Sequence, residues 1–402
     1  MDTPMTTEDP EDFPFTFPPG TAQPPELARL REEAPVTLVT LPTGDRAWLV
    51  TRYEDVKQVL ADPRFSRAAA ELPGAPQMGA SNPGPDVLLG MDGPEHARLR
   101  RTATRHFTAR RVEALRPWTR RLAERLMDDL ISAGPPADLV SRFALPLPLR
   151  LVLTLLGVPD EDSARLCALT DTAFSMTRHT PQEILEARGH LESYMAEMIG
   201  IRRRWPADDL LGALVAERDK EERLTEQQLI SFAFLLVTAG YLSTSNAIAS
   251  GFLTLLAHPE QFDRLRGDPE LIVSAAEELL RVNPSAITGA LLRVALEDVE
   301  LGGVAIRAGE GVLPAIGSAN HDVLLFADPE RVDILREGGS HLAFGHGVHR
   351  CLGAHMARME LQVALAVLLE RLPTARLAVP GQDLVWKDHP VSRGLVSLPV
   401  TW

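Results

Sequence analysis

A long apolar run near the middle of the chain most constrains its fold. Thr225 and Gln228 form a capping box, which marks a helix start, and helical periodicity continues to His258, where Pro259 stops it. A helix of this length measures roughly 50 Å, enough to cross a whole domain. Most of its middle is apolar on all sides, which indicates a buried helix. Gly240 in the middle indicates a kink or the close approach of a ligand.

The sequence predicts one mainly α domain with small peripheral β-sheets, over residues 26–402. Alternating apolar residues from Pro35 to Thr51 around a turn predict a β-hairpin, and residues 287–313 form a second β-rich stretch. Helical periodicity dominates elsewhere from Glu95 to Pro373. No flexible linker divides this body. Residues 1–25 contain seven prolines and are expected to be an extended lead-in.

Charge and cysteine content narrow the class of protein. Asp and Glu number 55 against 41 Lys and Arg, and the net charge of −14 disfavours nucleic acid and anionic membranes as partners. With only Cys167 and Cys351, the chain is not a disulfide-stapled secreted protein. The N-terminus has no signal-peptide pattern, and the longest apolar run, Phe232 to Gly240, is too short to span a bilayer. We therefore expect a cytoplasmic protein without a membrane partner.

The segment from Phe344 to Gly353 is the sharpest local feature of the sequence. Its glycines allow a tight turn and the close approach of a flat, bulky group. Cys351 comes just before a predicted amphipathic helix that runs to Leu372, and the free amides of a helix N-terminus, with Arg350 beside them, favour a thiolate. A cysteine without such surroundings, as at Cys167, is expected to be an inert core residue.

This segment resembles the haem-ligand loop of the cytochromes P450, and the resemblance extends from Pro35 to the C-terminus. It implies that Cys351 is the axial thiolate ligand of the iron of haem b, donating electron density that favours O–O cleavage. It also implies that neighbouring residues of the loop bind the haem. The matching or adjoining positions are Phe344, Gly345, Gly347, His349 and Gly353.

Two haem propionates need cationic or hydrogen-bonding partners. His96 and Arg100, one helical turn apart, resemble the propionate-binding pair of the family, and Arg293 and His349 match two further positions. A histidine taken alone is as often a solvated surface residue. The occurrence of all four in the order of the family favours haem binding.

Glu278 and Arg281 lie three residues apart on a predicted helix that follows Pro269, so they share one helical face. By itself such a pair is a common and weak surface interaction. The resemblance implies that the two residues form a buried triad with Arg336, which braces the haem loop. Val332 departs from the family pattern by replacing its usual second phenylalanine.

The long helix departs from the family at its catalytic positions. In the family an acidic residue and then a threonine follow the kink and relay protons to the bound oxygen. Here Leu242 occupies the acid position and carries no proton. Ser243 keeps the hydroxyl but lacks the methyl group that restricts its rotamer, and Thr244 comes one place late. These three residues, with Ala239 and Gly240, are the candidate catalytic positions.

Two explanations of this departure stay open. In the first, water and substrate hydroxyls complete the relay with Ser243, which gives ordinary monooxygenation. In the second, slow proton delivery marks oxidative coupling, desaturation or peroxide-assisted turnover. We favour the first.

The resemblance places one face of the long helix above the haem as a wall of the substrate pocket. Taken as a bare pattern, the same face is more often core packing. Mostly apolar walls predict a hydrophobic or amphipathic small molecule as substrate. The candidate pocket residues, which also include positions in a loop rich in proline and glycine and near the C-terminus, are Met78, Leu88, Leu89, Phe232, Leu235, Leu236, Ile287 and Val391.

We expect a haem-thiolate monooxygenase that inserts one oxygen atom from O2 into a secondary metabolite, by hydroxylation or epoxidation. A basic patch of Arg98, Arg101, Arg105 and Arg350 is expected to receive an acidic ferredoxin, itself served by a ferredoxin reductase, although such a run is usually a solvated helix face. Two other classes stay open. One is a haem-binding sensor or carrier without turnover, and the other is a hydrolase with a cysteine nucleophile.

Overall fold

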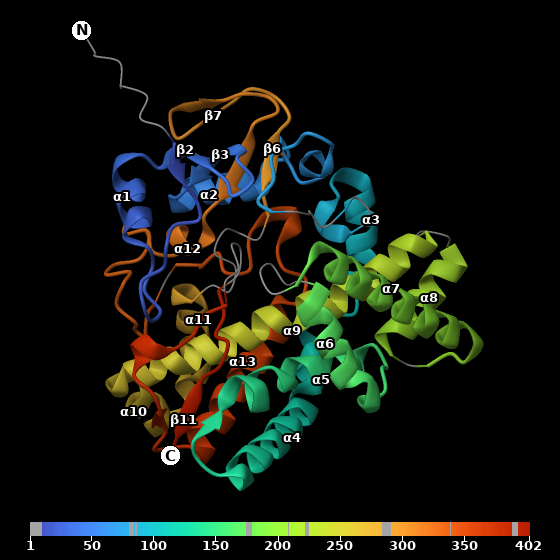
Figure 1. Ribbon diagram of the computed structural model, residues 1–402, viewed down its shortest axis with the longest axis vertical. Helices are drawn as coiled ribbons and strands as arrows, with labels where there is room; N and C mark the ends of the chain where they lie inside the picture. The colour runs from blue at the N-terminus through green and yellow to red at the C-terminus, as the bar shows by residue number, and fades with distance from the viewer. Residues whose placement is uncertain are drawn as a thin grey trace.

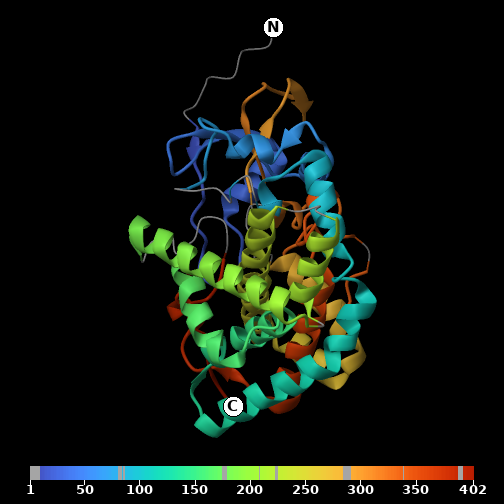
Figure 2. The same ribbon diagram turned by 90° about the vertical axis from the view of Figure 1, so that its right-hand side faces the viewer.

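The computed structural model has a large helical body with its strands gathered mainly at one end (Figure 1). Figure 2, turned by a quarter turn, shows the main group of strands at the same end. The structure describes residues 10–79, 84, 87–173, 179–207, 209–221, 225–283, 291–337, 339–387 and 393–402. Over these residues the prediction of a mainly α fold with small peripheral sheets is confirmed.

The largest sheet joins strands that are far apart in the sequence. Its order is β1 (Glu11–Asp12), β2 (Val36–Thr40), β3 (Arg46–Val50), β9 (Gly311–Pro314), β6 (Arg293–Ala295) and β4 (Phe65–Ser66). Strands β2 and β3 form the predicted hairpin, and β3 pairs in parallel with β9. Two smaller sheets join β10 (Arg376–Leu377), β11 (Pro399–Thr401) and β5 (Ala137–Asp138), and β7 (Val299–Leu301) with β8 (Val304–Ile306).

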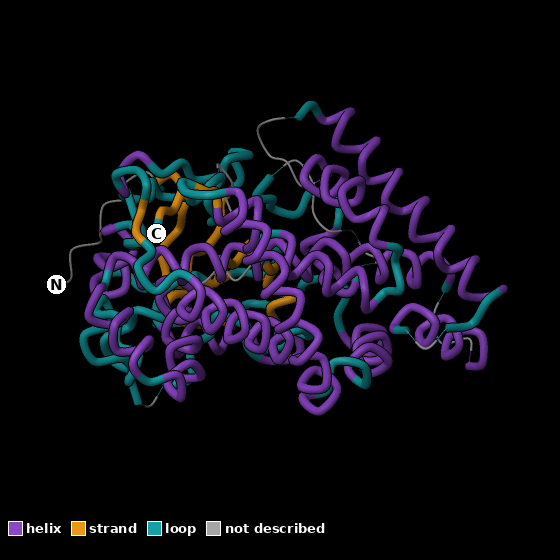
Figure 3. Tube along the Cα trace, turned by 90° about the horizontal axis from the view of Figure 1, so that it is seen from below, coloured by secondary structure: helices purple, strands orange, loops and turns teal. Residues whose placement is uncertain are grey.

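Three helices lie beside the main sheet, and the other helices build the rest of the molecule (Figures 1 and 3). The helices beside the sheet are α1 (Pro25–Glu33), α2 (Tyr53–Ala61) and α12 (Ile316–Ala319). The helical body consists of α3 (Gly93–Thr104), α4 (Ala109–Ala133), α5 (Pro146–Leu155), α6 (Ser163–Ala173), α7 (Pro181–Arg204), α8 (Leu210–Glu221), α9 (Glu226–Ala257), α10 (Pro259–Gly267), α11 (Ile272–Val282) and α13 (Ala354–Arg371).

Helix α9 is the predicted core helix, and its capping box is confirmed. The Thr225 hydroxyl accepts a hydrogen bond from the Gln228 amide at 3.0 Å, and the Gln228 side chain accepts one from the Thr225 amide at 3.1 Å. By length and composition α9 could cross a membrane, contrary to the expectation from its shorter apolar run. Its apolar stretch is instead mostly buried against α5, α7, α11 and α13, as in a core helix.

Gly240 serves close helix packing. Helix α9 continues through Gly240 without interruption. A Cβ atom at this position would lie 3.0 Å from Cγ2 of Val152 on α5, tighter than ordinary contact. The close neighbour on this side of Gly240 is therefore another helix, and the expected kink or ligand approach stays a prediction.

Helix α13 follows the cysteine loop as predicted but is not amphipathic. Every residue from Met359 to Leu365 is buried, including the polar Glu360 and Gln362. The reason is that α4, α9 and α11 all pack on this helix and leave little of it facing solvent. The prediction of an amphipathic helix was wrong in this respect.

The described part of the proline-rich lead-in lies against the body. Strand β1 pairs in parallel with β2, and Phe13 and Phe15 are buried with their rings 5.4 Å apart. Near the C-terminus, Arg393 donates hydrogen bonds to the carbonyl groups of the lead-in at Pro18, Gly20 and Ala22. The lead-in is thus held to the main sheet by a strand pair and to the C-terminal segment by the Arg393 side chain.

Candidate active site

The cysteine loop closes on itself through backbone hydrogen bonds. The Cys351 amide donates to the Phe344 carbonyl at 2.8 Å, and the Gly345 amide donates to the Leu342 carbonyl at 2.7 Å. Gly347 has a left-handed φ of 71°, and a Cβ atom there would lie 2.5 Å from the carbonyl oxygen of Leu60 at the end of α2. Only glycine fits this position, which seats the loop against α2 and places the cysteine just before α13.

Cys351 lies at the end of this loop, just before α13. The residue is solvent-exposed, yet enough protein surrounds it that burial raises the pKa of its thiol. The Gly353 amide and the cations of Arg100, Arg350 and Arg358 act in the opposite direction. The helix N-terminus and Arg350 thus act in the predicted direction, although burial outweighs them in the protein without haem. A bound metal cation deprotonates a coordinating thiol and would supply what the protein alone does not.

Four predicted propionate ligands lie together beside the cysteine loop. The rings of His96 and His349 lie 4.2 Å apart, and His349 Nε2 lies 3.0 Å from Asp92 Oδ1. Arg100 donates a hydrogen bond to the Arg350 carbonyl beside the cysteine. Burial lowers the pKa of His96 to about 4, with the charges of His349 and Arg100 acting in the same direction.

Arg293 completes this cationic group from strand β6. Its side chain is buried, and its guanidinium has no hydrogen-bond partner among the described residues. Burial lowers its pKa to about 10, against the attraction of Asp92. His96 Nε2 is also buried without a partner in this part of the chain. Buried donors of this kind normally have acceptors, so both side chains are available for one.

These observations fit a haem. The unpaired donors at His96 and Arg293 match the need of two propionate carboxylates for charged hydrogen bonds. The exposed sulfur of Cys351 would be free to ligate the haem iron. Gly345 has no atom within 4 Å of where a Cβ would stand, which leaves open space beside the loop.

The structure brings Glu278, Arg281 and Arg336 together in a buried cluster. Arg281 donates to both oxygens of Glu278 at 2.7 and 2.8 Å, and Arg336 Nε lies 3.2 Å from each of the same oxygens. The Asp333 amide adds a hydrogen bond of 2.9 Å. Burial alone would raise the pKa of Glu278, but the hydrogen bonds and charge of Arg281 hold it below its usual range.

Arg281 extends this cluster toward the cysteine loop. Its guanidinium donates to the carbonyls of Asn320 and Pro329, each at 2.9 Å. The Asn320 side chain accepts a hydrogen bond of 2.7 Å from the Leu342 amide, just before the loop. A continuous set of hydrogen bonds therefore links Glu278 to the segment that carries Cys351.

Among the predicted catalytic positions of α9, Ser243 is the exposed polar residue. Ala239 and Ser243, one turn apart, are exposed, and Ser243 Oγ lies 3.2 Å from the Ala239 carbonyl. Leu242 is half-buried and packs against the core. Thr244 is buried, and its hydroxyl lies 3.3 Å from the Gly240 carbonyl. The hydroxyls of Ser243 and Thr244 thus belong to different sides of α9.

The structure divides the candidate pocket residues. Phe232 and Leu236 lie a turn apart and are buried in the main core, as is Leu88, and Met78 is buried in the cluster beside the sheet. Their large apolar side chains are covered by neighbouring residues, and their pocket role stays a prediction. Leu235 and Leu89 are half-buried. Ile287 and Val391 lie outside the described residues.

Sequence reasoning missed Asp92 and Arg358. The Asp92 carboxylate accepts hydrogen bonds from His349, the Ser66 hydroxyl and the amides of Arg67 and Ala68. Asp92 precedes a Gly-Pro helix start, a position where an acidic residue is a recognisable signal. The Arg358 guanidinium lies 4.4 Å above the Phe344 ring and forms an ion pair with Glu277. Arg358 lies seven residues after Cys351, about two helical turns, and this spacing was the sequence signal that could have indicated it.

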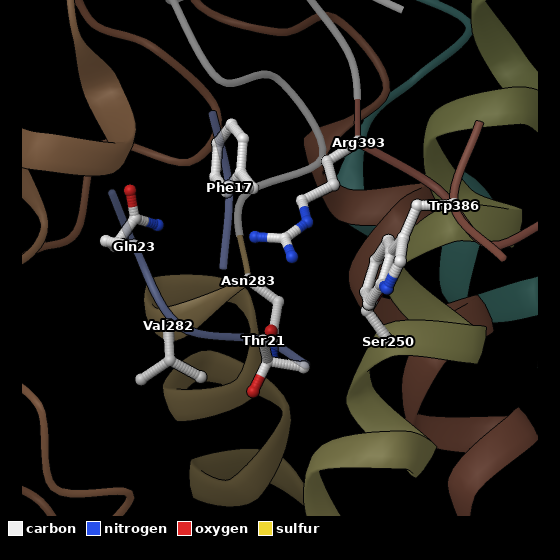
Figure 4. A pocket seen from close by; sticks show the side chains of 8 residues that line it. All are labelled: Phe17, Thr21, Gln23, Ser250, Val282, Asn283, Trp386 and Arg393. Carbon is white, nitrogen blue, oxygen red and sulfur yellow. The ribbon is translucent and has the colours of Figure 1, made fainter. Parts of the chain in front are cut away.

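A pocket elsewhere in the molecule lies where the lead-in meets the C-terminal segment. Its lining includes Phe17, Ser250, Asn283, Trp386 and Arg393. Figure 4 shows the Arg393 guanidinium between the rings of Phe17 and Trp386, 4.1 and 4.2 Å from their centroids. Because the guanidinium also donates to three backbone carbonyls, this pocket is a packing junction separate from the cysteine loop.

The basic side chains expected on the cysteine side are largely accessible. Arg101, Arg105 and Arg350 are exposed, and Arg98 is half-buried with its guanidinium 3.8 Å from Glu95. The hydrogen bond from Arg100 to the Arg350 carbonyl holds α3 against the cysteine loop. Arg350 therefore lies next to α3, which carries Arg98 and Arg101 and is followed directly by Arg105.

Comparisons with known proteins agree with this site. Residues 148–375 match the family model for cytochrome P450. The chain is 47% identical to nocardicin C N-oxygenase of Nocardia uniformis subsp. tsuyamanensis, over 99% of this chain and 100% of that protein. It is 46% identical to mycinamicin IV hydroxylase/epoxidase of Micromonospora griseorubida, again over 99% and 100%. The solved structure of the putative thioether synthase SgvP, involved in the tailoring step of griseoviridin, is 42% identical with a TM-score of 0.93, over 98% of this chain and 100% of that one.

These matches confirm the predicted family, fold class, haem b cofactor and monooxygenase chemistry. They favour neither an atypical oxidation nor a haem sensor, and the hydrolase alternative was wrong because the matching proteins are oxygenases. The chain belongs to the cytochrome P450 family and is a haem-thiolate monooxygenase of secondary metabolism.

Proposed function

We propose that this monooxygenase hydroxylates, epoxidises or N-oxygenates an apolar or amphipathic natural product with few charges. The observation that carries the proposal is the exposed pair of Ala239 and Ser243 on α9, a helix whose only charged residue is Glu226 in its first turn. A face of this kind offers a substrate apolar contact and one hydroxyl. The relatives named for N-oxygenation and for hydroxylation or epoxidation support these reaction types.

In this proposal Cys351 would ligate the haem iron, and His96, Arg100, Arg293 and His349 would hold the propionates. When bound, haem b supplies oxygen activation. The unpaired donors at His96 and Arg293 support the assignment. Phe344, Gly345 and Gly353 shape the loop around the haem, and the Glu278 cluster fixes the segment that precedes it.

The Ser243 hydroxyl directs a proton toward the side of α9 that would face the bound oxygen. Its hydroxyl is exposed, and its 3.2 Å contact with the Ala239 carbonyl is long enough for the hydroxyl to turn toward another acceptor. Leu242 excludes a carboxyl group from this turn, so water or a substrate hydroxyl joins Ser243. The proposed pocket residues are those predicted from the sequence: Met78, Leu88, Leu89, Phe232, Leu235, Leu236, Ile287 and Val391.

The electron donor is proposed to be a ferredoxin with its reductase. Exposed arginines on α3 and at Arg350 support an acidic partner on the cysteine side. We further propose that residues 26–402 act as a single domain in the cytoplasm, with the lead-in attached to it.

Spectral titration with a panel of apolar natural products tests the substrate class. Binding beside the haem displaces water from ferric iron and shifts the Soret band, and a binder is then incubated with NADH, ferredoxin and reductase. We expect one product heavier by one oxygen atom. Binding confined to strongly charged compounds, or turnover without oxygen incorporation, would overturn the proposal.

A further inference from the structure

Arg393 is a half-buried cation at the packing junction between the lead-in and the C-terminal segment. Its guanidinium lies between the rings of Phe17 and Trp386, and it donates three hydrogen bonds to carbonyl groups of residues 18–22 (Figure 4). Burial lowers its pKa to about 10, and no described carboxylate acts against this effect. The guanidinium nevertheless keeps its charge at neutral pH, because aromatic faces and carbonyl oxygens stabilise it. Arg393 therefore depends on the lead-in for its partners.

The lead-in is held to the body at both ends of the segment that Arg393 contacts. On one side, β1 pairs in parallel with β2, and Phe15 is buried. On the other side, α1 begins at Pro25 and buries Leu27 and Leu30 in the same apolar cluster as Phe15. Carbonyl groups held in this way keep fixed positions, so they give the Arg393 side chain a firm support.

Arg393 directly precedes one strand of a two-stranded ribbon, formed by residues 385–387 and 394–396. The Lys387 amide donates to the Gly394 carbonyl at 2.8 Å, and Trp386 forms an antiparallel bridge with Leu395. An isolated two-stranded ribbon is marginally stable in water and needs contacts outside itself. Arg393 and Trp386 meet in the junction, so the guanidinium joins both strands of the ribbon to the lead-in.

The ribbon lies on the side of α9 that carries Ser243. Residues three or four positions apart share one side of a helix, and here they are Ala239, Ser243, Asn246 and Ser250. The first two are exposed, and the last two are buried. A Cβ atom on Gly394 would lie 2.1 Å from Asn246 Oδ1, so the ribbon backbone rests on that side chain, and Ser250 lines the junction. The exposed part of this side therefore ends where the ribbon begins.

We propose that Arg393 is a positioning residue for substrate binding, which fixes the place where the ribbon closes the exposed side of α9. It does so by binding the lead-in, the firm side of the junction. The inference rests on the proposed function, in which the substrate contacts Ala239 and Ser243. The lead-in thereby helps to determine how large a molecule fits beside Ser243, although it belongs to the opposite end of the chain. Arg393 acts through the ribbon and has no part in the chemical step.

Azole binding to the haem-loaded ferric protein, followed by the shift of the Soret band, tests this role without turnover. Imidazole is small, whereas the second ring of 4-phenylimidazole reaches further from the iron, and we expect wild type to bind 4-phenylimidazole more tightly. Arg393→Gln should weaken 4-phenylimidazole binding by about threefold or more and leave imidazole binding unchanged, because a loosened ribbon must be ordered when the larger probe binds. Arg393→Lys should recover only part of the loss, since an ammonium lacks the planar fork that stacks between two rings.

Two further variants complete the test. Arg376→Gln changes an exposed arginine on β10 and should behave as wild type. Phe17→Ala removes one aromatic face from the lead-in, leaves the ribbon sequence intact, and should also weaken 4-phenylimidazole binding.

The outcomes separate the inference from the proposed function. Unchanged azole selectivity in Arg393→Gln and Phe17→Ala would overturn the inference, and Phe17→Ala gives the decision alone should Arg393→Gln not hold haem. A wild type that binds imidazole more tightly than 4-phenylimidazole contradicts the apolar site of the proposed function instead. Hydrogen exchange at the Lys387 amide, expected to be several-fold faster in Arg393→Gln, then still decides whether Arg393 holds the ribbon.

Discussion

Two buried glutamates on adjacent helices, Glu278 and Glu360, behave in opposite ways. Glu278 on α11 accepts hydrogen bonds from Arg281, Arg336 and the Asp333 amide, and these hold its pKa below the usual range despite burial. Glu360 on α13 lacks such partners, and burial raises its pKa to about 8. Burial is common to both, so the partners decide whether a carboxyl is ionised and structural or protonated and available.

Removal of the ionised glutamate, Glu278, should have the largest effect on the stability of the folded protein. Glu278→Ala leaves Arg281 buried without its partner, and breaking such a pair costs about 3 to 5 kcal/mol. We expect little folded holoprotein, measured as haem content per purified chain. The exposed control Glu270→Ala should express normally. Normal yield and a normal thiolate-haem spectrum for Glu278→Ala would contradict the bracing role.

Arg336→Ala tests the Glu278 cluster with a smaller loss of stability than Glu278→Ala. The Arg336 side chain is 13% exposed and meets Glu278 at 3.2 Å, while Arg281 remains bonded to the carboxylate. Loss of a charged hydrogen bond of this kind costs about 1.5 to 3 kcal/mol. Denaturant unfolding of the holoprotein should therefore rank Arg336→Ala between wild type and Arg281→Ala. An Arg336→Ala loss that equals or exceeds the Arg281→Ala loss would break the ranking.

The protonated glutamate, Glu360, predicts that the free energy of unfolding decreases as the pH rises. The pKa of Glu360 rises from 4.5 to about 8 on folding, so the folded state holds a proton that the unfolded state releases above pH 4.5. This contribution to the unfolding free energy falls by up to about 1.4 kcal/mol per pH unit between these values and is constant above pH 8. Glu360→Gln should remove this slope. Parallel unfolding curves for wild type and variant across pH 5 to 8 would show that Glu360 is ionised.

Glu278 has the reverse sign. Its pKa is lowered on folding, so its stabilising contribution is complete above the unfolded value of 4.5 and is lost as the pH falls through the folded value. The pH series just described therefore also separates the two glutamates, since acid weakens the Glu278 cluster and base weakens the environment of Glu360.

Ser243→Ala should have the smallest effect on stability and a clear effect on turnover. Ser243 is exposed, and its hydroxyl bonds within its own helix, so folding should change little. We expect a larger share of the electrons from NADH to form hydrogen peroxide, because the variant lacks the hydroxyl that would pass the proton to the bound oxygen. An unchanged ratio of product to peroxide would argue against any relay that passes through Ser243.

Patterns within one segment predicted much of the fold. The capping box of α9 and the hairpin of β2 and β3 were predicted because their signals are local in sequence. The packing of α5 against Gly240 and the enclosure of α13 depend on which helices meet, and no local pattern contains that information.

The same limit applies to the site. Cys351 and the Glu278–Arg281 pair stand in recognisable motifs. The raised thiol pKa, the missing partners of Glu360 and the core position of Phe232 arise from surroundings built by distant segments. Asp92 shows an intermediate case, since its helix-start position was visible in the sequence but its hydrogen bond to His349 was not.

The absorption spectrum of the reduced, carbon-monoxide-treated protein tests the central assignment of Cys351 most directly. We expect wild type to show the strongly red-shifted Soret band that anionic sulfur ligation produces, and Cys351→His to lose that band while still binding haem. A wild-type band at the unshifted position of histidine-ligated haem, or a red-shifted band that survives in Cys351→His, would contradict the account.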